Sequence, residues 1–164
     1  MYEGQQPARP AYAGGAGGGA RMPNAARGQD VLRIGQADLE TFEQRLVALQ
    51  AAFSREDYDA LRNIGTPEVV SYLSEELAQN AAQGRRTEAT DVRLEQGDVA
   101  ESWREGTRDY ATVAMRYSMV AVTRERDGDR IIDGDPNSRV ESTEVWTFVR
   151  ERGSPWLLSA IQGS

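Results

Sequence analysis

Arg116 and Glu144 each interrupt a segment that is otherwise apolar, and they are the first candidates for chemistry. If both side chains point into the interior, they form a charge pair, and Arg116 can hold a phosphate through two parallel hydrogen bonds. If they lie on the solvent face, they form a cross-strand ion pair worth at most about 1 kcal/mol. Alternation along the chain places Arg116 on the same face as Thr112 and Ser118, which favours the solvent-face interpretation.

Carboxylates near strand-like segments are candidates for acid–base chemistry, and they are Asp91, Glu101, Asp109 and Glu144. A carboxyl group in an apolar interior has a raised pKa and acts as a base or as a neutral donor. No pair has a diagnostic spacing, and the sequence has neither histidine nor lysine among its 164 residues, so the usual general bases are missing. We therefore expect no enzyme, and an isomerase or dehydratase that uses a buried carboxylate is the least favoured alternative.

Metal and nucleic-acid binding are disfavoured by the composition. There is no cysteine, and the aspartate-rich run 127–135 lacks the ligand ladder and closing glutamate of a calcium loop. We expect no metal and no cofactor. The chain has 26 acidic and 19 basic residues, a net charge of −7, which repels phosphate backbones and anionic membranes at long range. We expect no nucleic-acid partner.

An apolar set of side chains has the chemistry of a lipid pocket. Methionine adapts to flexible acyl chains, and tryptophan or tyrosine suits an amphipathic ligand. Part of the set alternates along two predicted strands: Met115, Tyr117, Met119, Trp146 and Phe148. The other two residues, Leu73 and Leu77, lie on the inward face of a predicted helix. The alternative is that these side chains are simply the core face of the sheet, packed against helices. The sequence leaves both interpretations open.

Three helices are predicted ahead of the strands. A helical stripe of apolar residues marks the first: Leu39, Phe42, Leu46, Leu49 and Phe53. Asp38 is its predicted N-cap, and Ser54 is the predicted cap of a short second helix that ends at Gly65. The Thr-Pro-Glu sequence at 66–68 opens the third helix, which ends at Gly84.

The period changes to two after residue 84, which indicates strands. Residues 91–103 predict one long strand with a bend at Gly97, and residues 110–123, 140–150 and 156–161 predict three more. Residues 124–139 are rich in turn signals and are predicted as a loop. Helices followed by an antiparallel meander predict an α+β fold, in which the helices pack on a curved four-stranded antiparallel sheet that forms a cone.

The first part of the chain differs in composition from the rest. Residues 13–20 are only alanine and glycine, and prolines flank them on both sides. Such a segment has too little apolar surface to offset the entropy lost on ordering. We expect residues 1–33 to be a disordered Gly/Ala/Pro-rich tether and residues 34–164 to form one domain.

Several segments carry a resemblance to a known family. The pair of sequences Glu144-Val-Trp146-Thr-Phe148 and Trp156-Leu-Leu-Ser-Ala-Ile161-Gln162 is the most specific part, and residues 38–53 and 54–68 add to it. About residues 36–162 resemble the C-terminal domain of the mitochondrial inner-membrane translocase subunit forty-four, in its bacterial type. The resemblance implies a cone-shaped fold of the nuclear-transport-factor-two superfamily. It also implies a non-catalytic role in protein translocation or membrane-protein biogenesis, with inner-membrane attachment, lipid contact and tethering of protein partners.

We therefore expect a membrane-proximal lipid- or protein-binding module. The chain itself is expected to be soluble and held at the inner membrane through a segment outside this sequence. Its expected partners are a phospholipid or other apolar ligand, and membrane proteins or the translocation machinery. The alternative is an interaction or dimerisation domain without a ligand pocket, whose exposed sheet face binds a partner or a second copy in a homo-oligomer.

Overall fold

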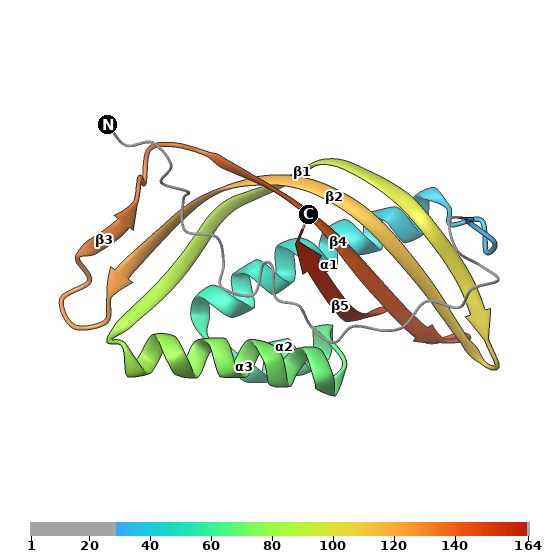
Figure 1. The fold of residues 1–164 in the computed structure, drawn as a ribbon, viewed down its shortest axis with the longest axis horizontal. Coiled ribbons are helices and arrows are strands. Elements are labelled where there is room, and N and C mark those ends of the chain that lie inside the picture. The colour runs from blue at the N-terminus through green and yellow to red at the C-terminus, as the bar shows by residue number, and fades with distance from the viewer. Residues whose placement is uncertain (1–28, 164) are drawn as a thin grey trace.

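The computed structural model describes residues 29–163, in which three helices lie on the concave side of a curved antiparallel sheet (Figure 1). The helices are α1 (Gln36–Arg55), α2 (Tyr58–Ile64) and α3 (Pro67–Ala82). The strands are β1 (Arg85–Glu105), β2 (Arg108–Glu125), β3 (Ile131–Gly134), β4 (Val140–Glu151) and β5 (Leu157–Gly163). The sheet order is β1-β2-β4-β5, and β3 also pairs with β2. The predicted α+β class and curved sheet are confirmed, with one strand more than predicted.

Strand β3 is the additional strand. It lies in the stretch 124–139, which the turn signals predict as a loop, and it pairs with the end of β2 from Val122 to Arg124. Gly134 closes this short strand with φ +90°, and a Cβ atom there would clash with the carbonyl oxygen of Ala121. The turn signals are real, but they bracket a strand of 4 residues, which is too short to show an alternating pattern.

Strand β1 is bent, as the sequence predicted. Its 21 residues pair with β2 along a register that slips between Thr90 and Arg93, between Leu94 and Gln96, and again just beyond Val99. These irregularities flank Gly97 on both sides. Each one adds local twist, so the long β1–β2 hairpin curls over the helices instead of remaining flat (Figure 1).

Two helix caps differ from the prediction. Helix α1 begins after Gly35, and the carboxylate of Asp38 lies in its first turn, where it accepts a hydrogen bond from the Gly35 amide at 3.3 Å. Helix α2 is capped by Asp57, whose side chain accepts a backbone hydrogen bond of 3.1 Å. Ser54 is therefore not a helix cap, and it lies in the last turn of α1, facing β1.

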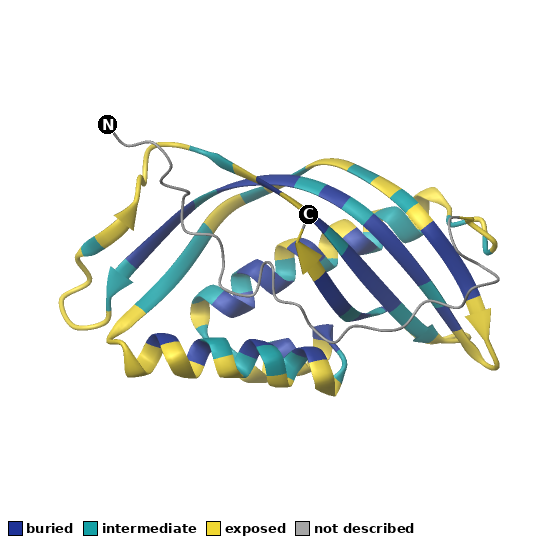
Figure 2. Ribbon diagram, viewed as in Figure 1, coloured by how far each residue is buried: buried dark blue, intermediate teal, exposed yellow. Residues whose placement is uncertain are grey.

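The concave face of the sheet and the inner sides of the helices form one continuous buried core (Figure 2). Phe42 of α1 stacks on Phe148 of β4 with ring centroids 4.1 Å apart, and it meets Trp156 edge-on at 5.2 Å. Leu46 and Leu49 continue the same helical stripe and are fully buried. The apolar periodicity of α1 thus fixes that helix against β4 and the start of β5.

Residues just before α1 pair with the outer edge of β1. The Ser102 amide donates to the carbonyl of Gln29 at 2.9 Å, and the Val31 amide donates to the carbonyl of Ser102 at 3.2 Å. The Ser102 hydroxyl also donates to the carboxylate of Asp30 at 2.6 Å. Contacts with the sheet therefore begin before residue 34, the predicted start of the domain. The rest of the predicted tether, residues 1–28, lies outside the described residues.

Candidate functional site

The residues predicted to line a lipid pocket all lie in the hydrophobic core, and none is more than 2% exposed. They are Leu73, Leu77, Met115, Tyr117, Met119, Trp146 and Phe148. Tyr117 meets Trp146 edge-on at 6.5 Å, and Trp146 lies 6.2 Å from Phe148 between ring centroids. The structure brings these side chains together, and they line neither the small pocket beside Ser54 nor the larger hollows around Pro67. The lipid pocket stays a prediction.

Glu144 lies inside this core with 0% exposure. Its Oε1 atom accepts hydrogen bonds from the Tyr117 hydroxyl and from the Trp146 indole nitrogen, both at 2.9 Å. Gln50 of α1 donates to the Tyr117 hydroxyl at 3.4 Å. Because a buried polar group is costly unless it is hydrogen-bonded, the network explains how the sheet tolerates a carboxylate here. It also links α1, β2 and β4.

The structure does not bring Arg116 and Glu144 together. Met115 is the residue opposite Glu144 and Thr143 is the residue opposite Arg116, so alternation puts the two charged side chains on different faces of the sheet. Arg116 forms a cross-strand ion pair with Glu141 at 3.3 Å, and both side chains are largely exposed. Such a pair contributes at most about 1 kcal/mol.

The other candidate carboxylates are held in hydrogen-bonded contacts or buried. Asp109 is 1% exposed and accepts hydrogen bonds from Arg104 at 2.7 Å and from Arg150 at 3.2 Å. Burial alone would raise the pKa of Asp109, but the two guanidinium groups outweigh it and hold the pKa below its usual value. Asp91 pairs with two further arginines, and Glu101 is buried in β1. Asp109 is thus a structural anion and not a general base.

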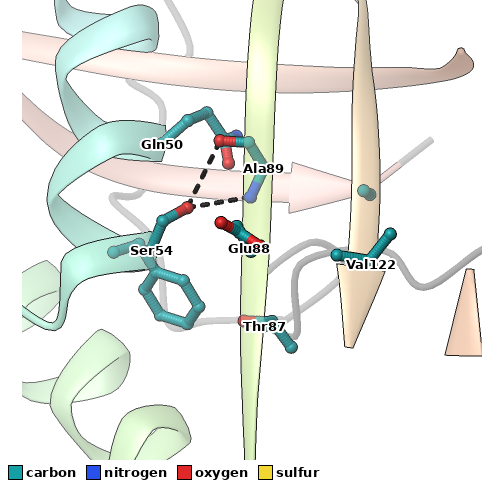
Figure 3. A pocket seen from close by; sticks show the side chains of 8 residues that line it. Gln50, Ser54, Thr87, Glu88, Ala89 and Val122 are labelled. Carbon is teal, nitrogen blue, oxygen red and sulfur yellow. Dashed lines mark hydrogen bonds between the residues drawn. The ribbon is translucent and has the colours of Figure 1, made fainter. Parts of the chain in front are cut away.

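A small pocket of about 10 Å³ lies between α1 and the edge of β1 (Figure 3). The Ser54 hydroxyl reaches across it, accepts a hydrogen bond from the Ala89 amide at 2.8 Å and lies 3.4 Å from the Ala89 carbonyl oxygen. A helix side chain thereby takes the place of a neighbouring strand. The volume suits about one water molecule, so this pocket is not a ligand site.

A much larger groove of about 520 Å³ lies where the start of α3 meets the β4–β5 turn. Its wall is apolar at Pro67, Val149, Pro155 and Leu157. Its polar lining comes from α1, α2, the start of α3, the start of β2 and the end of β4: Arg45, Asn63, Thr66, Glu68, Arg108, Arg150, Glu151 and Ser154. This volume is within the range of small-ligand pockets in proteins.

The segment between α2 and α3 shapes one side of the groove. Gly65 forms a parallel bridge with Leu158, and the Thr66 amide donates to the Leu158 carbonyl at 2.9 Å. A Cβ atom on Gly65 would lie 3.2 Å from Val69 and 3.4 Å from the Leu158 carbonyl oxygen, which leaves little space for a side chain. The close approach of this segment to β5 places Pro67, the first residue of α3, at the groove. A second hollow of about 370 Å³ lies beside it and shares Pro67.

Within residues 29–163, two polar atoms of the groove lining are buried without a hydrogen-bond partner: Nε of Arg45 and Oγ1 of Thr66. Thr66 is the N-cap residue of α3, yet its side chain makes no capping hydrogen bond. The other two lining arginines are engaged, since Arg108 pairs with Glu151 at 2.8 Å and Arg150 pairs with Asp109. Arg45, in contrast, has no acidic partner among residues 29–163, so its charge at the groove is open to an anionic group of a ligand.

A model of the Tim44-like domain matches residues 36–163, nearly the range of the resemblance seen in the sequence. The chain belongs to the Tim44-like domain family. Tim44-like domains are translocation-related, membrane-associated and generally non-catalytic. Among residues 29–163 no helix is both long and apolar enough to cross a bilayer.

The intermembrane-space region of the chloroplast protein ARC6 shares the Tim44-like fold of this chain. Its crystal structure superimposes with a TM-score of 0.52 at 13% sequence identity, over 80% of this chain and 99% of that chain. At this identity the likeness concerns the fold alone. No curated protein sequence matches the chain.

Sequence reasoning missed the groove of this Tim44-like domain. Its lining comes from segments far apart in the chain, for example Arg45, Asn63 and Leu157, so no local spacing reveals it. The Thr-Pro-Glu sequence at 66–68 predicted the start of α3 but not what that start faces. Arg45 was visible as a lone cation among the acids on the polar side of the first helix.

Proposed function

We propose that this Tim44-like domain is a non-catalytic, membrane-proximal module that docks a protein partner, a membrane protein or a component of the translocation machinery, in the groove beside Pro67. The observation that carries the proposal is the groove itself, about 520 Å³ with an apolar wall and unsatisfied polar atoms. The concave sheet face, in contrast, is occupied by packed side chains.

The groove has the composition of a peptide-docking surface. Val149, Pro155 and Leu157 offer apolar contacts, while Asn63 and Ser154 offer groups that can bind a peptide backbone. Its walls belong to elements that are fixed by the core and by the bridge between Gly65 and β5. A preformed surface of this kind binds with a small entropic penalty.

Membrane attachment in this proposal comes from a tether or a partner. The net charge of −7 makes electrostatic attraction to an anionic bilayer unfavourable. A domain held near the membrane meets its partners at a high effective concentration, so even a modest groove affinity suffices.

Lipid binding on the concave sheet face is a second proposal. It is supported by the polar network of Tyr117, Glu144 and Trp146 inside an otherwise apolar face, because an amphipathic ligand needs one polar contact in an apolar site. It requires the core to open. Native mass spectrometry of the purified protein tests it, since a co-purifying lipid supports this site and its absence argues against it.

The isomerase alternative gains no support from the geometry. Its two best candidate bases, Glu144 and Asp109, are 0% and 1% exposed, and each is already hydrogen-bonded to protein donors. A general base must lie within reach of the substrate proton.

Photo-crosslinking tests the docking proposal in cells. A photoreactive amino acid replaces Ser154, which lines the groove, and in a matched variant it replaces Ser138, an exposed serine outside the groove. We expect a discrete crosslinked membrane protein from position 154 and none from position 138. Equal crosslinking from both positions, or none from position 154, would refute the proposal.

A further inference from the structure

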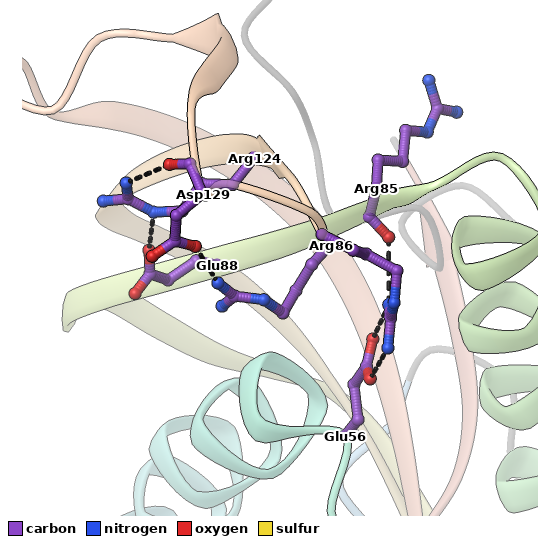
Figure 4. Close-up of polar contacts among 7 residues, drawn as sticks. Glu56, Arg85, Arg86, Glu88, Arg124 and Asp129 are labelled. Atoms are coloured by element: carbon purple, nitrogen blue, oxygen red, sulfur yellow. Dashed lines mark hydrogen bonds and ion pairs between the residues drawn. The ribbon is translucent and has the colours of Figure 1, made fainter.

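Most arginines within residues 29–163 are paired with acids. Figure 4 shows an example at the end of the sheet away from the groove, where Arg124 pairs with Glu88 at 2.8 Å and Arg86 pairs with Asp129. Within residues 29–163, the arginines that have no acidic side chain within 4.0 Å are Arg33, Arg45, Arg85 and Arg152.

Arg45 differs from the other three. Arg33, Arg85 and Arg152 are exposed, so water solvates their charge, whereas Arg45 is partly buried and lines the groove. Its Nε atom is enclosed and has no acceptor among the described residues. The charge of Arg45 is therefore partly desolvated and has no counter-charge within residues 29–163, and a carboxylate that enters the groove and reaches the guanidinium supplies one. Arg45 is thus a partly buried arginine of the groove without an acid among residues 29–163, and its charge is open to an acid of a binding partner.

We propose that the docked segment is an extended apolar stretch that carries an aspartate or glutamate, and that this carboxylate pairs with Arg45. This inference rests on the proposed docking function of the groove. Planar guanidinium and carboxylate groups fit each other through two parallel hydrogen bonds. The neighbouring Thr66 hydroxyl, which also lacks a partner, is a second donor for the same segment.

A peptide fits the lining better than a phospholipid does. Glu68 and Glu151 also line the groove, so it is not the strongly basic surface that favours binding to an anionic lipid headgroup. The lining combines apolar side chains such as Val149 and Leu157 with the polar Ser154, a mixture that suits the side chains and backbone of a peptide. A volume of about 520 Å³ is too small to enclose both chains of a phospholipid.

The test uses the full chain and two sets of short fluorescent peptides. Both sets are rich in leucine, valine and proline, and they differ only in one central glutamate or glutamine. The variants are Arg45→Gln, which keeps a good helix former in α1, and the matched control Arg85→Gln, whose arginine also has no acid but lies far from the groove. In Figure 4 the Arg85 guanidinium points away from Glu56.

We expect glutamate peptides to bind the unmodified protein about tenfold more tightly than glutamine peptides, the effect of a hydrogen-bonded charge. Arg45→Gln should abolish this preference and Arg85→Gln should preserve it. The inference is overturned if both variants lose the preference equally, if neither loses it, or if no peptide binds. It is also overturned if Arg45→Gln instead abolishes binding to phosphatidylglycerol vesicles.

These outcomes are distinguishable from failure of the docking function itself. Glutamate and glutamine peptides that bind equally, while the crosslink from position 154 persists, leave the docking groove intact and remove only the role of Arg45. Loss of the crosslink refutes the groove as a docking site whatever the peptides do.

Discussion

The concave sheet face and the groove beside Pro67 differ in how their buried polar groups are satisfied. On the sheet face, Glu144 is fully buried and accepts hydrogen bonds from Tyr117 and Trp146. In the groove, Arg45 and Thr66 each have a buried polar atom without a partner. A buried carboxylate that accepts hydrogen bonds from core side chains stabilises the fold, while an arginine without an acidic partner at an opening leaves a charge that an incoming anion can pair with. On our proposal, the sheet face serves the structure and the groove serves recognition.

This contrast predicts that Trp146→Ala destabilises the domain far more than any substitution in the groove. Trp146 is fully buried, packs on Tyr117 and Phe148, and donates to Glu144. Its loss should lower the free energy of unfolding by about 4 kcal/mol, as measured by urea denaturation followed by circular dichroism. A loss below about 1 kcal/mol would mean that this face is hollow, and it would strengthen the lipid-pocket proposal.

Asp109→Asn should be the next most damaging change, at about 2 kcal/mol near neutral pH, because it removes the charge-assisted hydrogen bonds from Arg104 and Arg150, whose own side chains remain partly exposed to water. The pKa of Asp109 is lowered in the folded protein, so its contribution is complete well above the unfolded pKa of about 3.9 and is lost as the pH falls below that value. The difference in unfolding free energy between the two proteins should shrink accordingly between about pH 5 and pH 3. A difference in unfolding free energy that stays constant over this pH range would contradict the role of Asp109 as an ionised partner of the two arginines.

Ser54→Ala tests the hydrogen bond by which the Ser54 hydroxyl accepts from the Ala89 amide at the edge strand β1. The change removes the hydroxyl that accepts from the Ala89 amide at 2.8 Å and leaves a partly buried donor of β1 without an acceptor. We expect a loss of about 1–2 kcal/mol and faster hydrogen exchange at the Ala89 amide. Unchanged exchange at that amide would show that water replaces the hydroxyl without a penalty.

Arg45→Gln should have the smallest effect on stability, within about 0.5 kcal/mol, because this side chain has no hydrogen bond or ion pair to lose among the described residues. The same change should remove the preference for acidic peptides. Thermal unfolding of the variant next to the unmodified protein checks the predicted effect on stability. A loss of more than about 2 kcal/mol would place Arg45 among the structural residues and contradict the contrast between the groove and the sheet face.

The fold was largely predictable because its main elements are long and periodic. The stripe from Phe42 to Phe53 and the alternation from Val113 to Ala121 each repeat often enough to identify an element and its buried side. Strand β3 has only 4 residues and carries no such pattern. Its identity depends on pairing with β2 around Thr123, which is a tertiary effect.

The site was much less predictable. Alternation predicts that Met115 and Tyr117 point inward, but a lined cavity and a filled core have the same pattern, so the sequence alone leaves the two alternatives open. The position of Ser54 is a similar case, since its hydroxyl serves β1 instead of a helix cap. That Arg45 lacks an acid is a property of the folded chain, because it depends on what the other elements place around it.

Amide chemical-shift mapping of the protein with a glutamate-containing apolar peptide tests the central claim most directly. If the groove is the docking surface and the sheet face is a packed core, the largest shifts will fall on amides around the groove, such as Asn63, Thr66 and Leu157. Shifts centred instead on Met115, Tyr117 and Trp146 would show that the core opens to take the ligand, and they would contradict the account.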